Sequence, residues 1–142
     1  MKHSPLRIYV AGASNEREDR AKPVMRELRG LGLVITHDWT SSMDNPAVGP
    51  DHALTPEQKR KYTEVDLLGV RAADFMLLLV PYIHSAGAWV ELGFAFGLNI
   101  PVIACGGGDK RLSNIFMSKT CREFDLDAQG VKFLYDLQVE RG

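Results

Sequence analysis

The sequence has little of several features that mark specialised classes of protein. It contains two cysteines, Cys105 and Cys121, which lie too far apart for a CxxC motif. We therefore expect reduced thiols in a cytoplasmic protein rather than a disulfide or a zinc site. The formal net charge at pH 7 is −1, which gives no electrostatic reason to expect binding to nucleic acid or to a membrane.

Long apolar runs are also lacking. The longest, from Phe75 to Pro81, has the length of a strand and is too short to cross a bilayer. The N-terminus does not show the charged-then-apolar pattern of a signal peptide, because residues 7–12 read as a first strand. The histidines show no metal-ligand spacing, and the glycines at 106–108 lack the Lys-Ser/Thr pair of a P-loop.

What is present is the composition of an ordinary globular domain, and we expect one domain over residues 1–142. Apolar runs and helical periodicities alternate along it. We expect strands at 7–12, 33–39, 75–80, 101–105 and 123–126, helices at 17–31, 55–73, 87–98, 112–117 and 128–140, and a polar loop at 40–54. This alternation predicts an α/β fold: an open, mostly parallel five-stranded sheet with helices on both faces, doubly wound as in flavodoxin or Rossmann folds.

The run from Ser85 to Ile103, SAGAWVELGFAFGLNIPVI, is the most informative segment. It places one carboxylate, Glu91, in a nearly uncharged helix. We expect Glu91 in the first turn, where the helix dipole and unpaired N–H groups favour its anion. The inward face is expected to contain Val90, Phe94 and Leu98, and Ala88, Leu92 and Ala95 widen this apolar surface. The loop before the helix, with Ser85 and Gly87, is a candidate seat for a phosphate. From spacing alone, a glutamate that merely complements its own helix remains an equal alternative.

Topology supports a ligand site near Glu91. In open parallel sheets, ligands bind beyond the carboxyl ends of the strands. The loops expected at that edge are 13–16, 40–54, 82–87 and 106–110. Trp39 is expected at the end of the second strand, and therefore also at this edge.

Several of these residues together resemble a known family. Tyr9 and Gly12 on the first strand, Asp66 in a helix, AAD before an apolar strand and the segment around Glu91 are similar to the nucleoside 2-deoxyribosyltransferase superfamily. The similarity extends from Arg7 to about Leu137. A serine at position 85, where transferases usually carry aspartate, and LSNI at 112–115 are closer to the 2′-deoxynucleoside 5′-phosphate N-hydrolases and nucleotide N-glycosidases.

The resemblance implies a role for each matching residue. Glu91 matches the nucleophile, Asp66 the aspartate that contacts sugar and nucleophile, and Tyr9 a tyrosine beside the nucleophile. For Asp66, a solvated helix charge is the alternative. Trp39 is the candidate for stacking on the nucleobase, and a core or rim aromatic is the alternative. The expected substrate-binding residues are Gly12, Ser14, Asn15, Trp39, Ser85, Gly87, Ser113 and Ile115, with Ser113 donated across a homodimer. The hydrolases carry an arginine soon after the glycine, whereas this chain has Ser14 and Asn15 there and Arg17 further on.

The expected chemistry follows from these residue types. Breaking an N-glycosidic bond builds positive charge on C1′, and a carboxylate below that carbon can stabilise the cation and then attack it. We expect a cofactor-free, metal-free N-glycosidase that hydrolyses a (2′-deoxy)nucleoside 5′-monophosphate. The alternatives are a deoxyribosyltransferase acting on free nucleosides, a non-catalytic nucleotide-binding sensor, and a nucleotide hydrolase of a phage or defence system.

Overall fold

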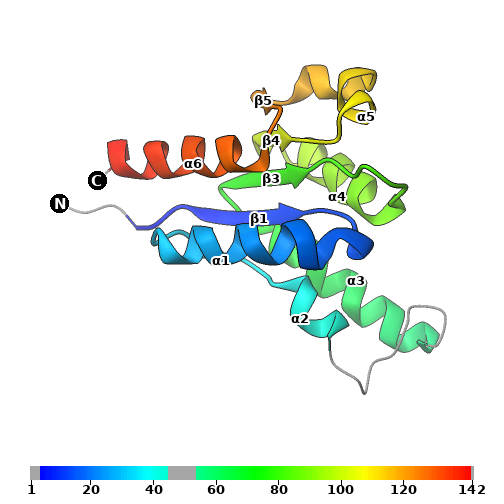
Figure 1. Ribbon diagram of the computed structural model, residues 1–142. Helices are drawn as coiled ribbons and strands as arrows, with labels where there is room; N and C mark the ends of the chain where they lie inside the picture. Colours follow the sequence, from blue (N-terminus) through cyan, green and yellow to red (C-terminus); the bar gives the residue numbers. More distant parts are fainter. Residues whose placement is uncertain (1–3, 45–53, 142) are drawn as a thin grey trace.

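Five parallel strands form one sheet in the computed structural model, which describes residues 4–44 and 54–141 (Figure 1). The strands are β1 (Arg7–Ala11), β2 (Val34–Ile35), β3 (Phe75–Leu79), β4 (Val102–Cys105) and β5 (Arg122–Phe124). Their order is β2-β1-β3-β4-β5, and every neighbouring pair is parallel. The predicted α/β class and open parallel sheet are confirmed.

Helices cover both faces of this sheet. They are α1 (Lys22–Gly30), α2 (Trp39–Met43), α3 (Pro56–Arg71), α4 (Ala86–Gly97), α5 (Asp109–Leu112) and α6 (Asp127–Arg141), with a 3₁₀ turn η1 (Ser14–Glu16), a π-helical turn η2 (Arg17–Ala21) and a 3₁₀ helix η4 (Ile115–Lys119). Helix α1 contacts α6, and α3 contacts α4. The first pair lies on one face and the second on the other (Figure 1). Successive side chains of a strand therefore point to different helix pairs.

The burial of the strands explains the apolar runs in the sequence. All residues of β4 and all but the first of β1 and β3 are buried, as expected for parallel strands covered on both faces. Helix α3 begins where the sequence predicts, because Thr55 and Gln58 form a capping box ahead of Pro56.

Two predicted elements differ from the structure. Strand β2 ends at Ile35, and Trp39 begins α2 instead, because the carboxylate of Asp38 accepts the N–H of Thr40 at 3.0 Å and caps this helix. The helix expected at 112–117 is divided into α5 and η4, because Asn114 caps a new turn. Residues 45–53 of the expected loop lie outside the described residues.

The predicted inward face of α4 is wrong for Val90 and Leu98 but is confirmed for Phe94, which packs against the core. Val90 is 62% exposed and Leu98 is also exposed, whereas the buried residues are Ala88, Leu92 and Ala95. Small alanine side chains let the helix backbone lie close to the sheet. A helix that is apolar nearly all round does not reveal from its pattern which side faces the core.

The two cysteines lie in contrasting surroundings. Cys105 is buried at the end of β4, and Cys121, just before β5, is exposed; both are free thiols. Among the described residues, no helix is long and apolar enough to cross a membrane.

Candidate active site

A hydrogen bond between Tyr9 and Glu91 forms the centre of the candidate site. Tyr9 lies in the middle of β1, is completely buried, and projects toward the α3–α4 face. Its hydroxyl donates to Oε2 of Glu91 at 2.5 Å. The two residues lie 82 positions apart in the chain, so this contact exists only because β1 and α4 pack together.

Glu91 lies deeper in its helix than the sequence predicts. It is the sixth residue of α4, in the second turn, where the dipole of the helix end contributes less. Burial raises the pKa of its carboxyl from 4.5 to about 7, and the charge of Asp66 adds to this rise, while the Tyr9 hydrogen bond lowers the pKa. The Tyr9 hydrogen bond thus favours the anion of Glu91, as expected, while burial opposes it.

Tyr9 is held as a neutral phenol. Burial, followed by the negative charges of Glu91 and Asp66, raises the pKa of Tyr9 well above its ordinary value of 10.0. Its hydroxyl is therefore a permanent hydrogen-bond donor to Oε2 of Glu91, which leaves the other carboxylate oxygen available for a different partner.

Asp66 belongs to the same cluster and pairs with a histidine. It lies on α3, and its charge acts on both Tyr9 and Glu91. Its Oδ1 lies 3.1 Å from Nε2 of His37, in the segment after β2. The sequence did not point to His37, because a single histidine without metal-ligand spacing carries no signal of its own. The expected strand at 33–39 also included it, whereas in the structure it lies beyond the end of β2.

Gly69 lets these elements come together. A Cβ atom at this position would lie 2.7 Å from the Cβ of His37 and 3.0 Å from the ring of Tyr9. Only a residue without a side chain permits α3 to approach the sheet this closely. The glycine thus helps to place Asp66, one turn earlier on the same helix, beside Tyr9 and Glu91.

Ser85 and Gly87 lie at the start of α4, as the sequence predicts. Ser85 is the N-cap, and its Oγ accepts the N–H of Ala88 over a long 3.5 Å. Gly87 is exposed, with open space where a Cβ would be. These two residues precede Glu91 on the same helix, so they are fixed relative to it.

The other predicted binding residues lie at the carboxyl edge or beyond it, without contacts that test their roles. Gly12 follows β1 directly, and Ser14 and Asn15 are exposed in η1. Arg17 is engaged locally: its Nη1 donates to the carbonyl of Ser14 at 2.7 Å, and its Nε lies 3.4 Å from Oδ1 of Asp44.

Trp39 is placed differently from the expectation. It is buried, and its indole N–H donates to the carbonyl of Val10 at 2.8 Å. This leaves little ring surface for a nucleobase, so the geometry favours the alternative of a core aromatic.

Ser113 directly follows α5, and Ile115 is the first residue of η4. The hydroxyl of Ser113 donates to the carbonyl of Asp109 at 2.6 Å, and Ile115 is 79% exposed. Of the apolar residues that follow Ile115, Phe116 is also exposed, whereas Met117 packs into the core. The structure of one chain therefore does not join this segment to the Tyr9–Glu91 cluster.

Comparison with known proteins identifies related folds. No family model and no curated protein sequence matches the chain. Two solved structures are similar over nearly their whole length. One is a conserved protein from Enterococcus faecalis V583, with 17% identity and a TM-score of 0.65 over 94% of this chain and 99% of the other. The second is the CMP N-glycosidase BcmB from Clostridium botulinum, with 15% identity and a TM-score of 0.59 over 92% and 98% of the two chains. At these identities, the likeness shows a shared fold.

The arrangement has the parts of a nucleophilic site. A partly buried carboxylate with a pKa near 7 receives one hydrogen bond from a neutral phenol, and a second carboxylate lies close by. Strongly shifted groups that gather in one cluster are typical of active sites.

Proposed function

We propose that the protein is an N-glycosidase that hydrolyses the bond between base and sugar of a nucleoside 5′-monophosphate, with Glu91 as the nucleophile. The observation that carries the proposal is the 2.5 Å hydrogen bond from Tyr9 to Glu91 beside Asp66. The fold shared with a CMP N-glycosidase supports the same general reaction.

The proposed reaction has two steps. In the first, the free oxygen of ionised Glu91 bonds to C1′ while the bond from C1′ to the base nitrogen breaks and its electron pair leaves with the base, which takes up a proton from the solvent. In the second, water bonds to C1′, the Glu91 ester bond breaks, and Asp66 accepts the proton of the water. Asp66 returns that proton to the solvent, and the products are the free base and the sugar 5-phosphate.

Tyr9 would serve the first step in two ways. Its donated hydrogen bond stabilises the ionised form of Glu91 against the cost of burial, and it holds the carboxylate in one orientation. Because only the ionised form can attack, activity should rise with pH through about 7.

The phosphate of the substrate would lie at Ser85 and Gly87. The hydroxyl of Ser85 makes only a long bond within the helix, and Gly87 leaves open space beside the first turn. A dianion there gains charge-assisted hydrogen bonds from the helix N-terminus.

A homodimer would complete the site. Exposed apolar side chains lie on the α5–η4 segment, at Leu112, Ile115 and Phe116, and on α3 and α4, at Leu68 and Val90. Exposed apolar surface of this kind is typical of protein interfaces. In the proposed dimer, Ser113 from one chain reaches the phosphate bound by its partner.

The decisive experiment incubates the protein with ribo- and deoxyribonucleoside 5′-monophosphates and with the matching nucleosides, and follows free base by chromatography. Base release that Glu91→Gln lowers by about a thousandfold or more, corresponding to about 4 kcal/mol of transition-state stabilisation, supports the proposal. Glu18→Gln is the matched control, because Glu18 is 66% exposed. Sugar transfer to an added base exceeding hydrolysis would indicate a transferase, and nucleotide binding without base release would indicate a sensor.

A further inference from the structure

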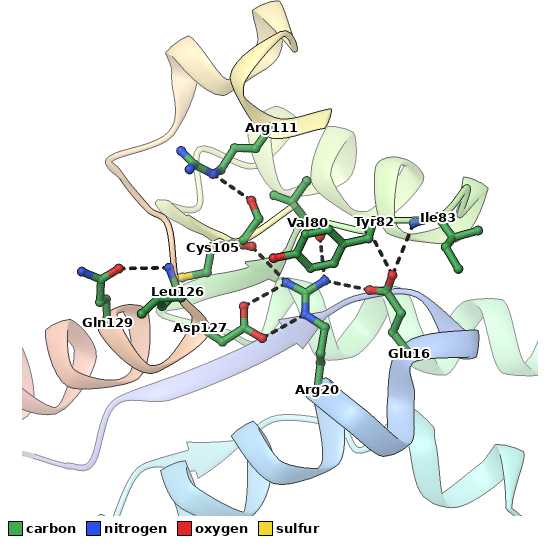
Figure 2. A network of polar contacts seen from close by, with 11 residues as sticks. Glu16, Arg20, Val80, Tyr82, Ile83, Cys105, Arg111, Leu126, Asp127 and Gln129 are labelled. Carbon is green, nitrogen blue, oxygen red and sulfur yellow. Dashed lines mark hydrogen bonds and ion pairs between the residues drawn. The ribbon is translucent and has the colours of Figure 1, made fainter. Parts of the chain in front are cut away.

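A second polar cluster, centred on Arg20, lies at the carboxyl edge of the sheet (Figure 2). Nε and Nη2 of Arg20 each donate to one oxygen of Asp127 at 2.9 Å. Nη1 donates to Oε1 of Glu16 and to the carbonyl of Val80, both at 2.7 Å, and Nη2 reaches the carbonyl of Cys105 at 3.2 Å. All five N–H groups of the guanidinium are thus engaged, so Arg20 has no donor left for a substrate.

Glu16 connects Arg20 to the loop between β3 and α4. Its second oxygen, Oε2, accepts the backbone N–H of Tyr82 at 2.9 Å and of Ile83 at 3.3 Å. The carboxylate is 12% exposed, and Figure 2 shows it between Arg20 and the loop. One side chain therefore fixes the chain two residues before Ser85, the N-cap of α4.

The cluster is packed tightly enough to act as a rigid support. The ring of Tyr82 lies over the guanidinium of Arg20, 4.8 Å from its Cζ. Gly106 has a φ of +71°, and a Cβ there would lie 2.6 Å from Nη2 of Arg20. Movement of the loop would break charge-assisted hydrogen bonds that are largely shielded from water.

We propose that Glu16 is a positioning residue for the phosphate end of the substrate. This inference rests on the proposed function, because it gives Glu16 a part in binding the same 5′-phosphate. Glu16 holds the loop that leads to Ser85 and Gly87, whereas Glu91 is held separately by Tyr9 from β1. A shift of the loop should therefore harm phosphate binding more than the chemistry at C1′.

The test compares Glu16→Gln and Glu16→Ala with Glu18→Gln, an exposed control two residues away on η2. The values of kcat and KM are measured with a nucleoside 5′-monophosphate and with the same nucleoside lacking its phosphate. For both Glu16 variants we expect KM for the monophosphate to rise by about tenfold, with kcat/KM for the nucleoside changed by less than about twofold. Glu16→Gln keeps the shape of the side chain, but its NH2 group must face either Arg20 or the loop N–H groups, which are all donors. It therefore breaks the link between Arg20 and the loop, and it carries the test if Glu16→Ala unfolds.

Calorimetric titration with the monophosphate separates this inference from the proposed function. A Kd raised about tenfold in Glu16→Gln and unchanged in Glu18→Gln supports the positioning role even if the protein releases no base. Equal losses with both substrates, an unchanged ratio between them, or no binding of the monophosphate by the natural protein would overturn the inference. Base release without any dependence on Glu16 would overturn it while leaving the proposed function standing.

Discussion

Replacing Glu91 with glutamine should make the protein more stable at alkaline pH while removing its proposed activity. The pKa of Glu91 rises from 4.5 to about 7 in the folded chain, so the folded state binds this proton more tightly than the unfolded state. The stability gained from that proton is fully present below pH 4.5 and is lost as pH rises through about 7. At about 1.4 kcal/mol for each tenfold change in proton affinity, the loss amounts to about 3 kcal/mol.

Glu91→Gln removes this titration and keeps an oxygen that can accept the Tyr9 hydroxyl. Relative to the natural protein, the variant should therefore gain about 3 kcal/mol in its free energy of unfolding between pH 4.5 and pH 8. Urea unfolding at several pH values, analysed by linear extrapolation, measures the difference. Glu18→Gln, at an exposed position, should show little change. If natural protein and Glu91→Gln differ by the same amount at every pH, the carboxyl is not held at a raised pKa and the reasoning is wrong.

Further predictions follow from the same contacts. Tyr9→Phe removes the donor that lowers the pKa of Glu91, so the rising limb of the pH–rate profile should move to higher pH; an unchanged profile would contradict this. Gly69→Ala forces a Cβ against His37 and Tyr9, and should cost about 1–3 kcal/mol in the free energy of unfolding, with weaker base release. A Gly69→Ala variant as stable as the natural protein would refute the close approach of α3 to His37 and Tyr9. Light scattering should give a mass near twice 15.8 kDa, and Ser113→Ala should weaken monophosphate binding without lowering Tm. A fully active monomer would contradict the dimer.

The fold was largely predictable because its signals are local. Apolar runs of strand length, glycines and prolines at element ends, and the capping residue Thr55 mark the order of elements. The failures also have local causes. Helix α4 has so few polar residues that its buried side depends on the fit of Ala88 and Ala95 against the sheet. The early end of β2 depends on Asp38 acting as a helix cap, which a strand-like run ending in Trp39 concealed.

The candidate site was predictable only in part. Glu91 was singled out as the one carboxylate of an apolar helix, and Tyr9 and Asp66 were named from a resemblance. The structure brings all three together. Physical pattern alone did not reveal His37. The Arg20 cluster was missed because it joins residues up to 107 positions apart, and a charged residue near the start of a helix reads as a surface residue. Arg20 is shielded from water by residues of several elements that meet at the edge of the sheet, and no single segment of the sequence reveals this.

The contrast between the two thiols makes the chain suitable for single-site labelling. Burial raises the pKa of the Cys105 thiol to about 12, so this group stays protonated and unreactive toward maleimides near neutral pH. Cys121 is exposed next to β5 and follows η4, which carries Ile115 and Phe116. A fluorophore attached there, without any engineered cysteine, would lie beside the surface proposed to join two copies. Energy transfer between labelled chains would then report their association and exchange in real time.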